Sequence, residues 1–154
     1  MVQVDTREQM HALGAHVAAQ LLPGDLIVLV GDLGAGKTTF VQGLGKGLGV
    51  ADPVTSPTFV IARAHKAPVL PLVHVDAYRL GSNVELDELD LDADLETSVT
   101  VVEWGEGKVE QLADNRLVIT ILRSDEDDDI RQVSFAGVGN RWSETQVLEL
   151  SPTW

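Results

Sequence analysis

A glycine-rich segment that ends in lysine and threonine has the residue types best suited to chemistry in this chain. Residues 31–38 read Gly-Asp-Leu-Gly-Ala-Gly-Lys-Thr, which fits the P-loop pattern of Gly, four residues, and then Gly-Lys-Thr. Glycines let the backbone curl with its N–H groups pointing inward, and a helix that starts there adds its positive dipole end. The segment therefore predicts an anion cradle for the phosphates of ATP.

Individual residues of this segment have separate expected roles. Lys37 is expected to reach the β and γ phosphates, the hydroxyl of Thr38 to coordinate Mg²⁺, and Thr39 to approach the α-phosphate. The alternative is a glycine-rich turn with a surface lysine, which a strand directly before the segment and a helix directly after it make less favourable. The expected nucleotide-binding residues are Gly31, Asp32, Leu33, Gly34, Ala35, Gly36, Lys37, Thr38 and Thr39.

A P-loop also needs a carboxylate near the metal, at the end of a neighbouring strand. Asp76 ends the apolar run Leu-Val-His-Val-Asp, and Glu103 ends the run Val-Thr-Val-Val-Glu. Both should lie at the carboxyl edge of an open α/β sheet, where ligands bind. One could hold Mg²⁺, directly or through water, and the other could orient the attacking water; the pattern does not assign them. The alternative for each is a polar residue that caps the next turn.

Four further residues have a functional and a structural interpretation. Thr58, in Ser-Pro-Thr-Phe, could sense the γ-phosphate or the metal, or the motif could be a Ser-Pro turn that opens a strand. Arg79 could stabilise transition-state charge or form a surface ion pair. Trp104 could stack on a nucleotide or a partner, or cover the core. Glu106 could join the outer shell of the metal or be solvated.

The elements that must position these residues begin with a helix over 7–21. Thr6 with Gln9 three residues later is a capping box, and apolar residues follow at helical spacing. Leu26–Val30 is a continuous apolar run, as expected of a strand buried on both faces of a parallel sheet. A helix over Lys37–Leu48 follows, with Gly49 placed to end it.

The remaining segments predict strands at 58–63, 69–76 and 98–103, and an antiparallel hairpin of 117–123 with 130–136 around an acidic turn. The tail, 141–150, is either a helix or a last strand. Strands that alternate with helices predict an α/β fold, namely a three-layer P-loop sandwich whose compact mixed sheet has a parallel core plus the antiparallel hairpin.

Composition limits the class of protein. The 154 residues predict a single domain over 1–154, and the absence of cysteine excludes disulfides, thiolate nucleophiles and cysteine-based zinc sites. The net charge of −13 disfavours direct, tight binding to nucleic acid. The acidic stretches 85–96 and 125–129 are either solvated surfaces or a docking face for a basic partner. The N-terminus has no signal-peptide pattern, so a cytoplasmic location is expected.

Four motifs in a fixed order carry a more specific signal than the P-loop alone. They are Gly31–Phe40 (GDLGAGKTTF), Ser56–Phe59 (SPTF), His74–Leu80 (HVDAYRL) and the EWGE of residues 103–106. In this the chain resembles the TsaE family (older name YjeE), the P-loop ATPase subunit of bacterial tRNA threonylcarbamoyladenosine (t6A) synthesis. The resemblance extends from Thr6 through the late hairpin.

This resemblance implies weak ATP hydrolysis that supports turnover of the transferase complex, which modifies adenosine 37 of tRNAs. The implied partners are the threonylcarbamoyltransferase subunit (TsaD-like) and its non-catalytic paralogue (TsaB-like), with tRNA contacted only through the complex and no membrane. By position, Thr38 and Glu103 would be the Mg²⁺ ligands and Asp76 a catalytic or switch carboxylate. The catalytic residues would then be Lys37, Asp76 and Glu103.

The resemblance also implies roles for three residues outside the P-loop. Thr58 would be a switch-like threonine, Trp104 a nucleotide-site or interface residue, and Thr6 a threonine near the adenine. Two other functions stay open at this stage. One is a nucleotide-dependent binding switch without significant turnover, and the other is a small-molecule kinase, which the lack of an arginine-rich lid disfavours.

Overall fold

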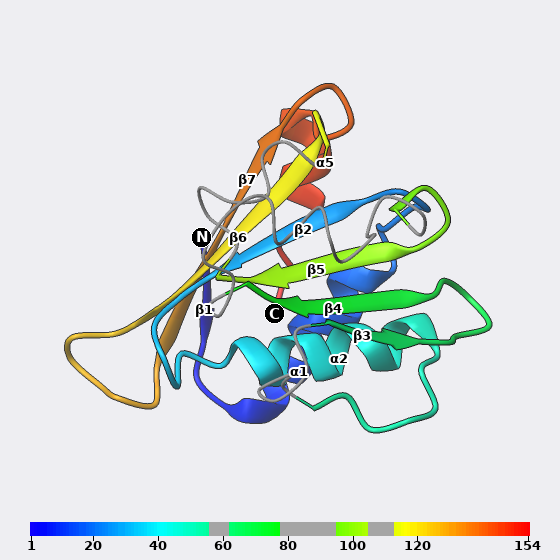
Figure 1. The fold of residues 1–154 in the computed structure, drawn as a ribbon. Coiled ribbons are helices and arrows are strands. Elements are labelled where there is room, and N and C mark those ends of the chain that lie inside the picture. Colours follow the sequence, from blue (N-terminus) through cyan, green and yellow to red (C-terminus); the bar gives the residue numbers. More distant parts are fainter. Residues whose placement is uncertain (56–61, 78–94, 105–112) are drawn as a thin grey trace.

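One sheet organises the part of the chain that the structure describes. The computed structural model describes residues 1–55, 62–77, 95–104 and 113–154, which Figure 1 shows in colour. Within them the sheet has seven strands, in the order β1-β7-β6-β2-β5-β4-β3. The elements are β1 (Val2–Val4), α1 (Arg7–Ala18), β2 (Leu26–Val30), α2 (Lys37–Leu48), β3 (Ala62–His65), β4 (Leu72–Asp76), β5 (Val99–Glu103), β6 (Arg116–Arg123), β7 (Arg131–Val138) and α5 (Glu144–Glu149).

Parallel strands form the centre of the sheet. β2 pairs in parallel with both β5 and β6, and β4 pairs in parallel with β5. β7 and β3 join antiparallel to β6 and β4, and β1 joins antiparallel to β7. The α/β fold class, with a mixed sheet of parallel core and antiparallel hairpin, is therefore confirmed.

The central strand β2 is buried on both faces, as its continuous apolar run predicts. Ile27 and Leu29 belong to the larger core cluster, together with residues of α1 and α2. Leu26 and Val28 point to the opposite face and belong to a smaller cluster with residues of β4 and β5. All four side chains are at most 2 % exposed. This burial fixes the strand from which the P-loop departs.

Helices α1 and α2 lie side by side against one face of the sheet (Figure 1). Glycines allow their close approach. A Cβ atom on Gly14 of α1 would collide with the backbone carbonyl oxygen of Phe40, and one on Gly43 of α2 would collide with that of His11. The two helices therefore pack backbone to backbone, which sets the position of α2 and of the loop that leads into it.

The structure departs from the predicted elements at both ends of the chain. β1 is not predicted, because three residues are too few to show an alternating pattern, yet it pairs with β7. α1 ends at Ala18 rather than near residue 21. The N–H groups of Gln20 and Leu21 bond three residues back, which tightens the chain before Pro23. The tail, which the sequence leaves open, contains the helix α5.

Other boundaries differ by only a few residues. β4 begins at Leu72 instead of near 69, since Pro71 directly before it lacks the N–H that a paired strand needs. The hairpin of β6 and β7 is confirmed, and the acidic turn that joins its strands, residues 125–129, is exposed. Of the expected strand at 58–63, the structure describes only residues from 62 onward.

Candidate phosphate-binding site

The loop between β2 and α2 places backbone amides at the carboxyl edge of the sheet. Its φ angles are 78° at Gly34 and 108° at Gly36, a region that favours glycine. Gly36 is also the N-cap of α2, and no side chain caps the helix there. Among the described residues, the backbone N–H groups of Gly36, Lys37 and Thr38 donate no hydrogen bond. Free backbone donors and the positive end of a helix dipole are the features that favour an anion, so this loop is the candidate site for phosphate.

Lys37 is buried inside this loop. The residue is only 6 % exposed. Its Nζ donates hydrogen bonds to the carbonyl oxygens of Gly31 (2.5 Å) and Asp32 (3.0 Å). Burial lowers the pKa of Lys37, while the charges of Glu103, Asp32 and Asp76 oppose that shift. The surface lysine of the alternative interpretation is therefore not what the structure contains.

Trp104 lies against the same lysine. The centroid of its ring is 4.1 Å from Nζ of Lys37, within the range of a cation–π contact. The φ angle of Trp104 is 59°, a left-handed conformation that strains a bulky residue. Backbone strain of this kind collects at functional sites. The ring of Trp104 thus covers Lys37 of the candidate site. The structural alternative for this residue was that its ring covers the core.

The two predicted carboxylates come together at the edge of the sheet. Asp76 ends β4 and Glu103 ends β5, and the two residues are register partners in parallel strands. They are 7 % and 3 % exposed, and both influence Lys37 electrostatically. His74, which the sequence analysis leaves without a role, places its Nε2 3.1 Å from Oε1 of Glu103. Glu103 is thereby held by a buried neighbour.

Thr6 and Thr39 line one hollow beside the loop. Its volume is about 420 Å³, and Gly34, Ala35 and Gly36 of the loop also line it. Thr6 is the N-cap of α1, and its Oγ1 accepts the N–H of Gln9 at 3.1 Å. The predicted capping box forms only in part, because Gln9 Oε1 accepts the N–H of Asp5. Thr38 lies half-buried in the first turn of α2.

Two arginines that the sequence analysis does not single out bind this loop from the hairpin. Arg123 Nη2 donates to the carbonyl oxygen of Leu33 at 3.1 Å, and Arg131 Nε donates to that of Ala35 at 3.0 Å. No local signal could reveal these contacts, because each pair is at least 90 residues apart in the chain. In the sequence both arginines look like ordinary hairpin residues, and only the assembled sheet shows that they contact the loop.

Comparison with known proteins identifies the family. The protein-family model described as "Threonylcarbamoyl adenosine biosynthesis protein TsaE" matches residues 4–133 of this chain. The chain belongs to the TsaE family. It is 54 % identical over 149 residues to the "tRNA threonylcarbamoyladenosine biosynthesis protein TsaE" of Streptomyces coelicolor, an alignment that covers 92 % of this chain and 99 % of that protein.

More distant TsaE relatives and a solved structure agree. The protein of the same name from Bacillus subtilis is 43 % identical over 136 residues, covering 88 % of this chain and 84 % of the relative. The crystal structure of YdiB from the same species superposes with a TM-score of 0.77 at 40 % identity, covering 96 % of this chain and 90 % of that one. The likeness therefore holds for both sequence and fold.

The donor set of this TsaE-family chain suits a nucleotide that carries Mg²⁺. Carboxylate and hydroxyl oxygens are ligands that Mg²⁺ takes, and Thr38, Asp76 and Glu103 supply them. Within residues 1–55, 62–77, 95–104 and 113–154, no three His, Cys, Asp or Glu side chains form a metal site of their own.

Some expected residues lie outside the described part of the chain. They are Thr58 with the rest of Ser56–Phe59, Arg79, Glu106 and most of the acidic stretch 85–96. Among the described residues, no helix is long and apolar enough to cross a membrane. The acidic turn at 125–129 is exposed to solvent, as both of its interpretations require.

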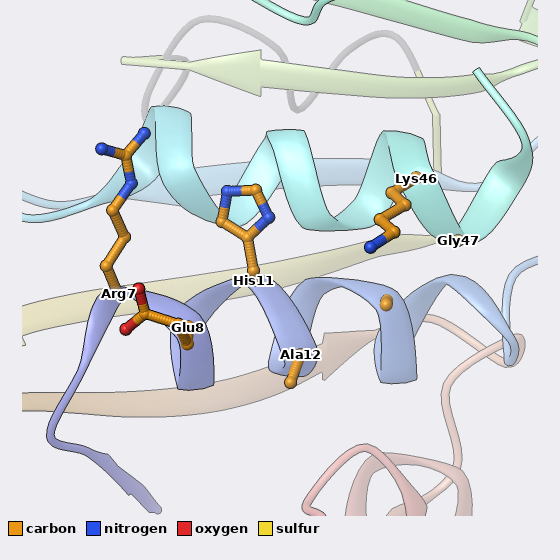
Figure 2. Close-up of a pocket in the computed structure, with 7 residues that line it drawn as sticks. Arg7, Glu8, His11, Ala12, Lys46 and Gly47 are labelled. Atoms are coloured by element: carbon orange, nitrogen blue, oxygen red, sulfur yellow. The ribbon is translucent and has the colours of Figure 1, made fainter. Parts of the chain in front are cut away.

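A second hollow lies between the outer surfaces of α1 and α2. Its volume is about 800 Å³, and Figure 2 shows Arg7, His11 and Lys46 spaced along it. Ala15 and Gly47 also line it, and none of its lining residues is buried. Small-molecule sites place a few buried polar groups in a concave pocket, so this open groove lacks what a nucleotide site needs.

Proposed function

We propose that this TsaE-family chain binds ATP with Mg²⁺ at the P-loop and hydrolyses it weakly. One observation supports the proposal above all. Several groups meet at one edge of the sheet: backbone N–H groups at the start of α2 that donate no hydrogen bond to any described residue, the buried Lys37, and the buried carboxylates of Asp76 and Glu103. Such a convergence of donors, a cation and acidic groups is what phosphoryl transfer requires.

Each side chain has a role in this proposal. Lys37 leaves its contacts with the loop carbonyls and binds the β and γ phosphates, while the amides of α2 hold their oxygens. Thr38 and Glu103 hold Mg²⁺, which supplies charge neutralisation on the phosphates when it is bound. Asp76, at the end of the next strand, orients the attacking water. Trp104 keeps solvent from Lys37.

The proposed hollow for the nucleoside adjoins this site. Thr39 at the start of α2 and Thr6 at the start of α1 face it together, next to Gly34–Gly36. A volume of about 420 Å³ is within the range of small-ligand pockets. The adenine and ribose would therefore lie between the start of α1 and the P-loop.

The process that ATP turnover serves is proposed from the relatives. Their names describe tRNA threonylcarbamoyladenosine biosynthesis proteins. We extend that role to this chain, as an accessory ATPase that acts on a threonylcarbamoyltransferase subunit (TsaD-like) and its paralogue (TsaB-like). The net charge of −13 supports contact with tRNA only through those partners.

The test measures ATP hydrolysis by the chain alone and with both transferase subunits. We expect slow turnover alone and strong stimulation by the partners. Lys37→Ala should abolish turnover, whereas Lys46→Ala, on the same helix but exposed, should leave it unchanged. Unchanged turnover in the Lys37→Ala variant would refute the proposal.

The two other functions predict different results. A binding switch without significant turnover predicts that a non-hydrolysable ATP analogue supports repeated cycles of tRNA modification. A small-molecule kinase predicts that ADP forms only when a particular acceptor is added. Our proposal predicts neither, because hydrolysis itself is required and water is the acceptor.

A further inference from the structure

The hairpin of β6 and β7 binds three consecutive carbonyl oxygens of the P-loop. Arg123, the last residue of β6, donates from Nη2 to the oxygen of Leu33 at 3.1 Å. Arg131, the first residue of β7, donates from Nε to the oxygen of Ala35 at 3.0 Å and from Nη2 to that of Gly34 at 3.5 Å. Two guanidinium groups from the hairpin thus bind three consecutive peptide carbonyls of the loop.

The planarity of the peptide group gives these contacts a consequence for the amides. In a trans peptide, a carbonyl and the N–H of the next residue point in opposite directions. Arginines that bind the carbonyls of residues 33–35 therefore turn the N–H groups of Gly34, Ala35 and Gly36 away from themselves. Ala35 N–H bonds to the carbonyl of Asp32 at 3.0 Å. The other two have no acceptor among the described residues.

Arg131 is itself fixed at several points. Its Nη1 donates to the carbonyl oxygens of Asp128 and, at 3.1 Å, of Ile130. Arg131 also lines the hollow of about 420 Å³ with Thr6 and Thr39. Register pairing of Arg131 with Val4 of β1 anchors its backbone as well. Because both the backbone and the guanidinium group of Arg131 are held, a change in the position of the hairpin would also move the P-loop carbonyls that Arg131 binds.

We propose that Arg131 and Arg123 are positioning residues that orient the P-loop amides and so set the affinity for the phosphates of ATP. The inference rests on the function proposed above. The arginines act through the loop carbonyls, and no contact with the reacting atoms is assigned to them. Because each contact is a charge-assisted hydrogen bond to a neutral acceptor, removing one should misalign the loop without removing a phosphate ligand.

Binding of MgATP to four variants tests the positioning role. We expect Arg131→Met to weaken binding by about tenfold or more and Arg123→Met to weaken it less, since it removes one contact rather than several. Arg131→Lys should restore only part of the affinity, because an ammonium cannot span two carbonyls as a guanidinium does. Arg116→Met, at the other end of β6, is the matched control and should bind normally.

Steady-state kinetics separates positioning from a role in the chemical step. Misaligned amides weaken substrate and transition state alike, so KM should rise while kcat stays close to wild type. A fall in kcat with unchanged KM would overturn the proposal. An affinity of Arg123→Met for MgATP within twofold of wild type would also overturn it. This variant keeps its fold, because Arg123 is exposed and makes a single contact with the loop.

Hydrogen–deuterium exchange tests the same idea without nucleotide. In the nucleotide-free Arg131→Met and Arg123→Met variants, the amide of Ala35, which is hydrogen-bonded to the carbonyl of Asp32, should exchange faster, with protection of β2 and β6 unchanged. Unchanged exchange in the loop would overturn the positioning role. If wild-type protein bound no MgATP but its loop still depended on the arginines, the proposed function would fail while the positioning of the loop stood.

Discussion

The imidazole of His74 lies 3.1 Å from the carboxylate of Glu103, across two neighbouring parallel strands. His74 is fully buried and Glu103 is 3 % exposed, so neither can exchange this partner for bulk water. Buried acidic groups need hydrogen-bond donors, and an imidazole N–H that donates to a carboxylate also fixes its orientation. Because Glu103 is the proposed Mg²⁺ ligand, the pair connects the core of the sheet to the site.

Loss of the His74 imidazole should affect both stability and metal dependence. In His74→Leu, Glu103 keeps its burial but loses a donor, so the free energy of unfolding should fall by about 1–3 kcal/mol in urea denaturation. The Mg²⁺ concentration for half-maximal ATP hydrolysis should rise by about tenfold. His74→Gln retains an amide donor and should recover part of both. Equal Mg²⁺ dependence in all three proteins would contradict the orienting role.

The ring of Trp104 should control the pKa of Lys37. Burial is the main cause that lowers this pKa, and the ring lies 4.1 Å from Nζ. Trp104→Ala removes a cation–π contact that favours the ammonium, but it also lets water reach Nζ. Because burial is the largest cause of the lowered pKa, we expect the pKa to move up toward its ordinary value of 10.5. Trp104→Phe keeps an aromatic face and should shift the pKa less. NMR titration of ¹³C-methylated lysine measures it; an unchanged pKa in the alanine variant would contradict the shielding role.

His65 should make the fold less stable as the pH falls. Burial lowers its pKa first of all, His74 and Arg63 lower it further, and Asp52 opposes them. The unfolded chain, with a pKa near 6.5, therefore takes up the proton before the folded chain does. Unfolding is then favoured as the pH drops through about 6.5, and the stability returns as the pH rises.

Substitution of His65 should remove this dependence. The free energy of unfolding of His65→Leu, measured in urea between about pH 5 and pH 7, should change less with pH than that of wild type. Val69→Ala, a change at an exposed residue that does not titrate, serves as the control and should keep the wild-type slope. Parallel curves for His65→Leu and wild type would count against the assignment.

Arg141 should stabilise the turn that precedes the P-loop strand. It binds both carboxylate oxygens of Asp25, each at 2.9 Å, and Asp25 is 5 % exposed. Arg141→Met leaves a buried charge without its partner, so the free energy of unfolding should fall by about 3–5 kcal/mol. The double variant with Asp25→Asn should lose less than the sum of the two single variants. Additive losses in urea denaturation would show that the two side chains do not interact.

Local pattern accounts for the parts of the fold that could be predicted from the sequence. β2, the loop and α2 are contiguous, so periodicity and glycine spacing are enough to place them, and the bounds of both elements agree with the structure. Asp76 and Glu103 were predictable for a different reason. Parallel strands end at one edge, so the last polar residue of each apolar run had to arrive there.

Contacts between distant segments account for what could not be predicted. Arg123 and Arg131 flank an acidic turn and look like solvated hairpin residues, until the sheet order brings β6 next to β2. His74 sits in an apolar strand, where a buried histidine is usually structural. Its partner Glu103 lies 29 residues away. Only the pairing of β4 with β5 reveals that the two meet.

The placement of β1 has a practical consequence for handling the protein. Val4 pairs with Arg131, and residues 4–7 line the hollow beside the P-loop. A purification tag fused ahead of Met1 would therefore be separated from the proposed nucleotide site only by the three-residue strand β1, close enough to compete with ligand in binding assays. The other terminus is the better choice for a fusion, because Trp154 lines a different hollow with His16 and Gln20, at the far end of α1.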